Sequence, residues 1–75
     1  MQILNVSKAA NISEGKACDL MFDGFRGVMR GGVAPYPVRG GLVVRVRPWI
    51  NGEYKVELVS AGTVIASAIC DQFDE

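Results

Sequence analysis

Histidine is absent from this chain of 75 residues, and cysteine occurs only at Cys18 and Cys70. The commonest general base and a frequent zinc ligand are therefore missing, and no Cys-x-x-Cys pair compensates for them. The two cysteines can either form a disulfide or serve as small buried apolar residues. The carboxylates are scattered along the chain. We expect no catalytic residues, no metal and no cofactors, and hence no enzyme.

Long apolar runs are also missing. None approaches the roughly 20 residues that a membrane-spanning helix needs, and residues 1–16 lack the basic start and apolar core of a signal peptide. We therefore expect a soluble, cytoplasmic protein with no membrane partner, of the kind that a phage or another mobile element encodes as an accessory. The length predicts one domain, 1–75, that buries only about 60% of its unfolded surface.

Net charge is zero, because eight basic residues balance eight acidic ones, but the two signs are segregated. Five arginines and no acids lie between positions 24 and 52, whereas the acidic tail, 71–75, holds three acids. Zero net charge disfavours strong nonspecific binding to nucleic acid. The segregation permits an acidic partner or head-to-tail self-association. The acidic tail is either disordered or pairs with the arginines of a neighbouring subunit.

One amphipathic helix is predicted over residues 13–30. Ser13 can cap its N-terminus, Glu14 suits the first turn, and Gly31 or Gly32 can end it in a left-handed conformation. Apolar residues recur there at spacings of three and four, which is typical of one buried helix face. This apolar stripe consists of Cys18, Met21, Phe22, Phe25, Val28 and Met29.

Three antiparallel strands are predicted at about 41–48, 53–59 and 63–70, with residues 2–6 as a possible fourth strand or the start of a helix. A three-residue loop, 50–52, with Gly52 in a left-handed conformation separates polar from apolar side chains on the two faces of the first pair of strands. The resulting cross-strand pairs are Trp49 with Glu53, Arg47 with Lys55, Arg45 with Glu57 and Val43 with Val59. The fold class is therefore α+β, with one amphipathic helix packed on a three- to four-stranded antiparallel β-meander.

The second turn, 60–62, is predicted to be another three-residue loop, because Ala61 disfavours the positive φ of a two-residue turn. The helix side of the third strand would then carry Val64, Ala66 and Ala68. Its outer side would carry Thr63, Ile65, Ser67 and Ile69.

The outer side of the sheet is our candidate functional surface. Large apolar groups beside arginines indicate that something covers it: the N-terminal segment, the Pro-rich loop around residues 33–41, or another chain. We expect a small non-catalytic interaction module that self-associates or binds another protein through this side. Its candidate partner-binding residues are Arg45, Arg47, Trp49, Ile65 and Ile69. Tyr36, between two prolines, is a second candidate contact.

The alternative hypothesis is a DNA-binding protein. Residues 3–22 have the spacing of a helix-turn-helix, with Asn11 at the turn and the later strands as a wing-like sheet. In this interpretation Lys16, Arg26 and Arg30 supply the nucleic-acid contacts.

Overall fold

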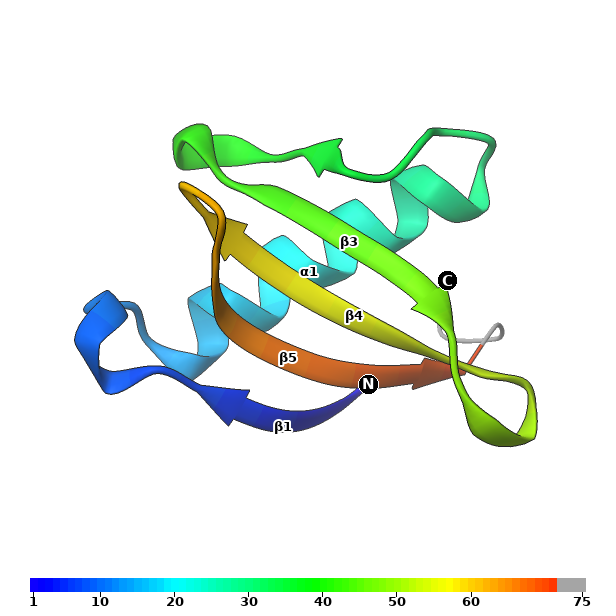
Figure 1. Cartoon of the computed structure of the whole chain (residues 1–75), viewed down its shortest axis with the longest axis horizontal. Helices are drawn as coiled ribbons and strands as arrows, with labels where there is room; N and C mark the ends of the chain where they lie inside the picture. The colour runs from blue at the N-terminus through cyan, green and yellow to red at the C-terminus, as the bar shows by residue number, and fades with distance from the viewer. Residues whose placement is uncertain (72–75) are drawn as a thin grey trace.

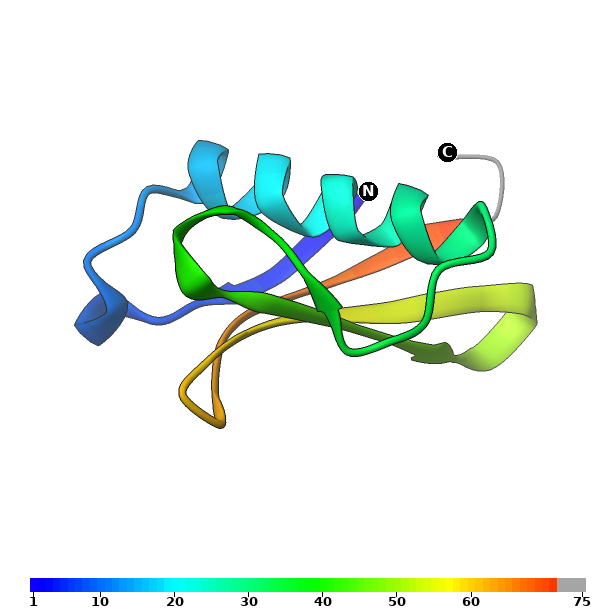
Figure 2. The same cartoon turned by 90° about the horizontal axis from the view of Figure 1, so that it is seen from above.

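The computed structural model describes residues 1–71 and places a single helix across one face of a five-stranded antiparallel sheet (Figures 1 and 2). The α+β fold is confirmed, and the sheet has one strand more than the largest number predicted. Its order is β1-β5-β4-β3-β2. The bounds are β1 Gln2–Val6, α1 Glu14–Met29, β2 Tyr36–Pro37, β3 Val43–Pro48, β4 Glu53–Ser60 and β5 Thr63–Asp71. Short 3-10 turns, η1 Lys8–Ala10, η2 Arg39–Gly41 and η3 Ile50–Gly52, lie in three of the connections.

Both ends of α1 are capped as the sequence predicts. The Ser13 hydroxyl accepts a hydrogen bond from the Lys16 backbone N–H at 3.1 Å. At the other end Gly31, with φ of 101°, donates to the Val28 carbonyl, and Gly32 donates to the Gly27 carbonyl. This pair of bonds satisfies two helix-end carbonyls and stops the helix.

The buried face of α1 differs from the predicted apolar stripe. Of that stripe only Met21 and Phe25 are fully buried; the other buried positions are Ala17, Leu20 and Gly24. Gly24 is buried because α1 approaches β3 closely at this point, where a Cβ on Gly24 would overlap the Val44 side chain. Gly24 therefore lies where α1 comes close to β3, the larger residues Leu20, Met21 and Phe25 fill the rest of the buried face, and Phe22 is only partly buried.

The register of β3 and β4 is the predicted one. Arg45 lies opposite Glu57, Arg47 lies opposite Lys55, and the Trp49 N–H donates to the Glu53 carbonyl at 2.8 Å. The three-residue loop is present, and Gly52 has the expected positive φ. Asn51 also has a positive φ, of 56°, which the prediction did not include.

The predicted turn between β4 and β5 is wrong. Ser60 pairs with Thr63, so the loop has two residues, and Ala61 adopts the positive φ of 48° that we expected it to avoid. A β-bulge follows, because Leu58 pairs with Ala66 while Val59 pairs with Val64. Ile65 is the extra residue of this bulge.

After the bulge, the side chains of β5 again lie on the faces that were predicted for them. Ala66 and Ala68 face the helix as predicted and are fully buried. The positions before it are reversed: Ile65 packs against the core on the helix side, whereas Val64 lies opposite Val59 and is 40% exposed. Ile65 was predicted on the outer side, so that placement is corrected.

The helix-turn-helix is also wrong. Its first helix would need residues 3–10, but Gln2–Val6 form strand β1, which pairs with β5, and only the short turn η1 follows. Ile3 and Val6 both pack against the core although they are three residues apart, because a register shift between Ile3 and Asn5 interrupts the alternation of β1. An edge strand therefore occupies the position where the DNA-binding hypothesis required the first helix of the helix-turn-helix.

The two cysteines lie at different depths. Cys70 belongs to the buried core, and Cys18 is half-buried on α1 with its sulfur 3.8 Å from Met1 Sδ. The core around Cys70 joins α1 to the three central strands through Leu20, Phe25 and Leu58.

Candidate partner-binding surface

The outer face, defined as the side of β1, β5, β4 and β3 that is turned away from α1, is not covered by any described element. Figure 2 shows α1 along one side of the sheet, with no helix or strand on the opposite side. The N-terminal segment and the Pro-rich loop had been expected as covers. Each instead extends the sheet at an edge, as β1 and β2. Intrachain covering by these two segments is therefore excluded.

Charged side chains on the outer face pair diagonally across β3 and β4. Arg47 lies directly opposite Lys55, a like-charge pair that is unfavourable if both side chains stay in line. The structure separates them. Arg47 donates to the Glu57 carboxylate at 3.3 Å, and the Lys55 ammonium lies 4.9 Å from the centre of the Trp49 ring.

Glu57 is the most enclosed charged group of this face, with 8% of its surface exposed. Arg47 bonds to it, and the strand register places Arg45 directly opposite it on β3. Arg45 and Arg47 are themselves exposed. Each therefore keeps donors directed at solvent that can bind a further acidic group.

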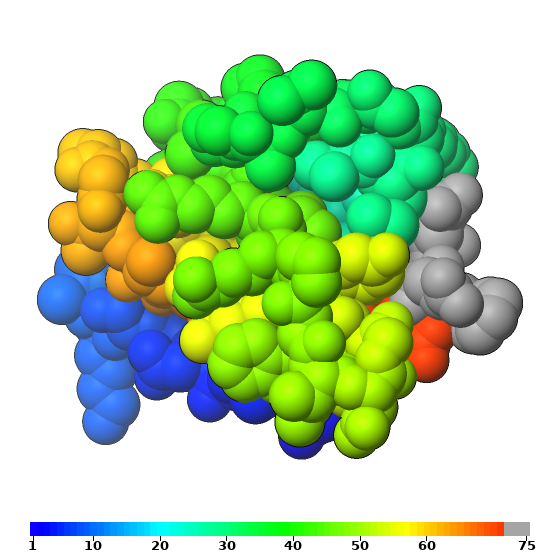
Figure 3. All heavy atoms as spheres, turned by 45° about the vertical axis from the view of Figure 1, so that its right-hand side comes forward, coloured from blue at the N-terminus to red at the C-terminus, as the bar shows by residue number. Residues whose placement is uncertain are grey.

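Two of the exposed large apolar residues are neighbours at the β3–β4 hairpin. Trp49 is 43% exposed and Ile50, the next residue, is 65% exposed. Figure 3 shows the atoms of this hairpin, in yellow-green, at the front of the surface. Strand alternation places Arg45, Arg47 and Trp49 on the same side of the sheet, and all three are exposed. Together with Ile50 they define what we call the Trp49 surface.

The free edge of β3 adjoins the Trp49 surface. β2 pairs only with Val43 and Val44, so the strand from Arg45 onward has no neighbour on that side among the described residues. Pro48 lacks a backbone N–H, which makes this edge a poor template for adding another strand. Side chains rather than backbone groups must therefore supply the binding contacts here.

Three other predicted contact residues lie elsewhere or are less accessible. Ile69 is on the outer face, but only 8% of its surface is exposed, so it supports the surface without offering much area. Ile65 is on the helix side, as described above. Tyr36 lies with its ring against Gly27 and Gly32, where a Cβ on either glycine would overlap it, so it acts mainly as a packing residue.

The residues proposed for nucleic acid do not form one cluster. Lys16 is in the first turn of α1, and Arg26 lies ten residues later, about 15 Å along the helix axis. Arg26 lies 5.4 Å from the centre of the Phe22 ring, and Arg30 lines a shallow hollow beside Gly31 and Tyr36. They therefore form no continuous basic surface with Lys16.

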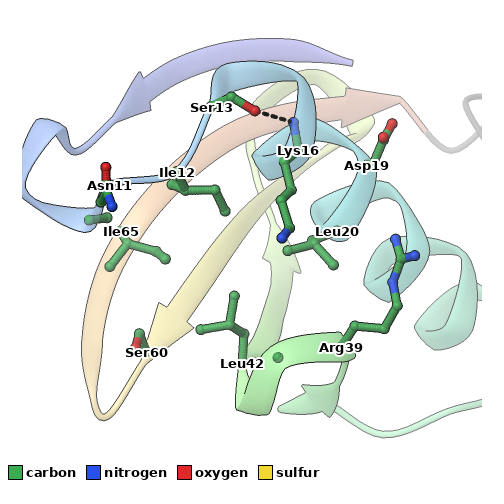
Figure 4. Close-up of a pocket in the computed structure, with 12 residues that line it drawn as sticks. Asn11, Ile12, Ser13, Lys16, Asp19, Leu20, Arg39, Leu42, Ser60 and Ile65 are labelled. Atoms are coloured by element: carbon green, nitrogen blue, oxygen red, sulfur yellow. Dashed lines mark hydrogen bonds between the residues drawn. The ribbon is translucent and has the colours of Figure 1, made fainter.

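A groove that the sequence did not reveal opens where the N-terminal end of α1 meets the sheet (Figure 4). Its volume is about 620 Å³. The apolar lining is Ile12, Leu20, Leu42 and Ile65, and the polar lining includes Asn11, Ser13, Lys16, Asp19, Arg39 and Ser60. Four separate segments supply these residues, and the bulge at Ile65 brings one of them in. Neither a motif nor a periodicity could have predicted the groove.

Within residues 1–71 no group of three or more His, Cys, Asp or Glu residues is placed to hold a metal ion. The single helix of the described chain is too short and too polar to cross a membrane.

No protein-family model, no curated protein sequence and no solved structure matches this chain. Its function must therefore be argued from its own surfaces.

Proposed function

We propose that this chain is a non-catalytic interaction module that binds a protein partner through the outer face of its sheet, centred on the Trp49 surface. The observation that carries the proposal is that α1 covers only one face of the sheet. No helix or strand of the described chain covers the outer face, which holds the Trp49 surface. Tryptophan and arginine are the residue types most enriched where interfaces bind tightly.

The chemistry of the surface suits an acidic and apolar partner. Trp49 and Ile50 offer apolar area that water now contacts. Arg45 and Arg47 offer planar guanidinium groups, which bind carboxylates in a fixed geometry. Glu57 holds Arg47 in place at 3.3 Å, so less side-chain entropy is lost when a partner binds it.

The test compares two truncations of exposed residues. Trp49→Ala removes the centre of the Trp49 surface, and Val33→Ala, at a position that is 80% exposed on the connection after α1, is the matched control. Proteins captured by the immobilised chain are identified and then measured as purified pairs by titration calorimetry. Sedimentation of the purified chain alone shows whether it forms dimers or larger species, in which case the partner is a second copy of the chain.

The proposal predicts that Trp49→Ala weakens the measured complex at least tenfold and that Val33→Ala leaves it unchanged. A complex equally strong in both variants would overturn the outer face as the binding site. Circular dichroism on both variants establishes that the fold is intact.

A further inference from the structure

We propose that the groove at the N-terminal end of α1 binds the segment after β5 from a second copy of this chain, with Phe73 in the groove and Asp74 and Glu75 at Lys16 and Arg39 on its rim. Copies would then associate head to tail. This contact uses a different surface from the Trp49 surface and does not rest on the proposed function.

The floor of the groove is apolar and continuous with the core. Leu20 is 1% exposed, and Ile12, Leu42 and Ile65 are partly buried hydrophobic residues packed against the same core. Ile65 reaches this floor only because of the bulge in β5. Bulges recur next to binding sites, where they redirect a side chain.

The rim of the groove carries two cations that are open to a new partner. Figure 4 shows Lys16 extending from the first turn of α1 into the groove and Arg39 approaching from η2. Lys16 forms no ion pair within the described chain. Arg39 makes a 3.5 Å contact to Asp23 between two exposed side chains, which is a weak interaction. Asp19 also lines the groove, so the rim carries one acid beside the two cations.

The segment that follows Asp71 has the complementary chemistry. Its residues are Gln72, Phe73, Asp74 and Glu75, which is one aromatic ring followed directly by two acids. An aromatic side chain supplies the largest apolar area per residue, and the following carboxylates match the lysine and the arginine. No other stretch of the chain joins an aromatic residue to two consecutive acids.

A copy cannot place its own Phe73 in its own groove. Strand β5 runs away from the groove, which contains Ile65, and reaches Asp71 six residues later, about 20 Å away. Phe73 is two residues beyond Asp71 and reaches back only about 7 Å. Figure 1 shows the end of β5 on the opposite side of the molecule from η1 and the β4–β5 turn.

A contact between one end of a copy and the other end of the next is heterologous. Such contacts generate rings when the rotation closes and open filaments when it does not. Every copy offers one groove and one segment after β5, so a blocked groove or an altered segment ends the growth.

The experiment uses two full-length variants. The groove variant carries Lys16→Glu and Arg39→Glu, which reverse both rim charges at exposed positions. The segment variant carries Phe73→Ala, Asp74→Asn and Glu75→Gln. A matched control carries Lys8→Glu and Arg30→Glu, two exposed cations that do not line the groove.

Sedimentation should show assemblies for the unaltered chain and for the control, and monomers for each of the two variants alone. An equal mixture of the groove variant and the segment variant should form dimers that grow no further, because only one intact groove and one intact segment can meet. All samples also carry Trp49→Ala, which removes self-association through the Trp49 surface. Assemblies in either variant alone, or a monomeric mixture together with no peptide binding in the NMR titration described next, would overturn the proposal.

A second measurement covers contacts too weak for sedimentation. A peptide of residues 70–75 is titrated into the segment variant up to roughly millimolar concentration and followed by NMR. The shifted resonances should be those of Leu20, Leu42 and Ile65, and the affinity for the groove variant should fall about tenfold or more. Shifts elsewhere, no shifts, or an equal response to the Phe73→Ala peptide would contradict the contact. The outcome is independent of Trp49, which the peptide does not approach.

Discussion

Gly24→Ala should destabilise the protein, although alanine is normally favoured over glycine in a helix. The added Cβ would lie 2.5 and 2.7 Å from the two Val44 methyl carbons, whereas carbon atoms pack at about 3.5–4.0 Å. The helix and β3 must therefore separate by about 1 Å. Crowding of this kind costs about 1–3 kcal/mol, and for so deep an overlap we expect the upper end. Helix propensity returns about 1 kcal/mol, so the net loss is about 2 kcal/mol.

Gly15→Ala is the matched control, because a Cβ there meets nothing within 4 Å. It should raise the free energy of unfolding by about 0.5–1 kcal/mol through helix propensity alone. Urea denaturation followed by circular dichroism measures both variants. With a denaturant slope of about 1 kcal/mol per molar for a domain of this size, Gly24→Ala should lower the midpoint by about 2 M. Equal stabilisation by both substitutions would refute the close contact between α1 and β3.

Three further substitutions test other parts of the fold by the same denaturation measurement. Ala61→Gly should raise the free energy of unfolding by about 0.5–1 kcal/mol, because Ala61 has a φ of 48°; no gain would refute the two-residue turn. Phe25→Ala should cost about 3–5 kcal/mol, because its buried ring packs 5.8 Å from that of Tyr54; a cost below 1 kcal/mol would exclude Phe25 from the core. Arg47→Ala should cost about 0.5–1 kcal/mol and less at high salt, since it leaves the enclosed Glu57 with fewer donors; a salt-independent cost would contradict the ion pair.

The parts of the fold that local chemistry determines were predictable. Ser13 and Gly31 mark the ends of α1 because a hydroxyl cap and a left-handed glycine are the cheapest ways to end a helix. The register of β3 and β4 followed from Gly52 and from the requirement that Arg45 and Arg47 avoid the core.

The parts that depend on tertiary contact were not predictable. Gly24 is buried because Val44, twenty positions away, occupies the space of its missing side chain. The bulge at Ile65 follows from the two-residue turn at Ala61, whose positive φ carries a local cost that the rest of the hairpin offsets. Pairing of β2 with β3 likewise depends on Tyr36 packing against α1.

Of the candidate surface, too, only the part that local chemistry determines was predicted. Arg45, Arg47 and Trp49 share one face because strand alternation places them there. Ile65 was assigned to that face because no local signal marks a bulge, and the groove that it lines is built from four segments that meet only in the folded chain.

The helix shields one side of the sheet only, which leaves the indole of the single tryptophan partly exposed to water. Because Trp49 is the only tryptophan, its fluorescence reports on that face directly. Quenching by acrylamide is the measurement of choice, since a neutral quencher is not affected by the Lys55 ammonium beside the ring. We expect ready quenching in a sample that sedimentation shows to be monomeric. A quench-resistant, blue-shifted emission from that monomer would contradict it.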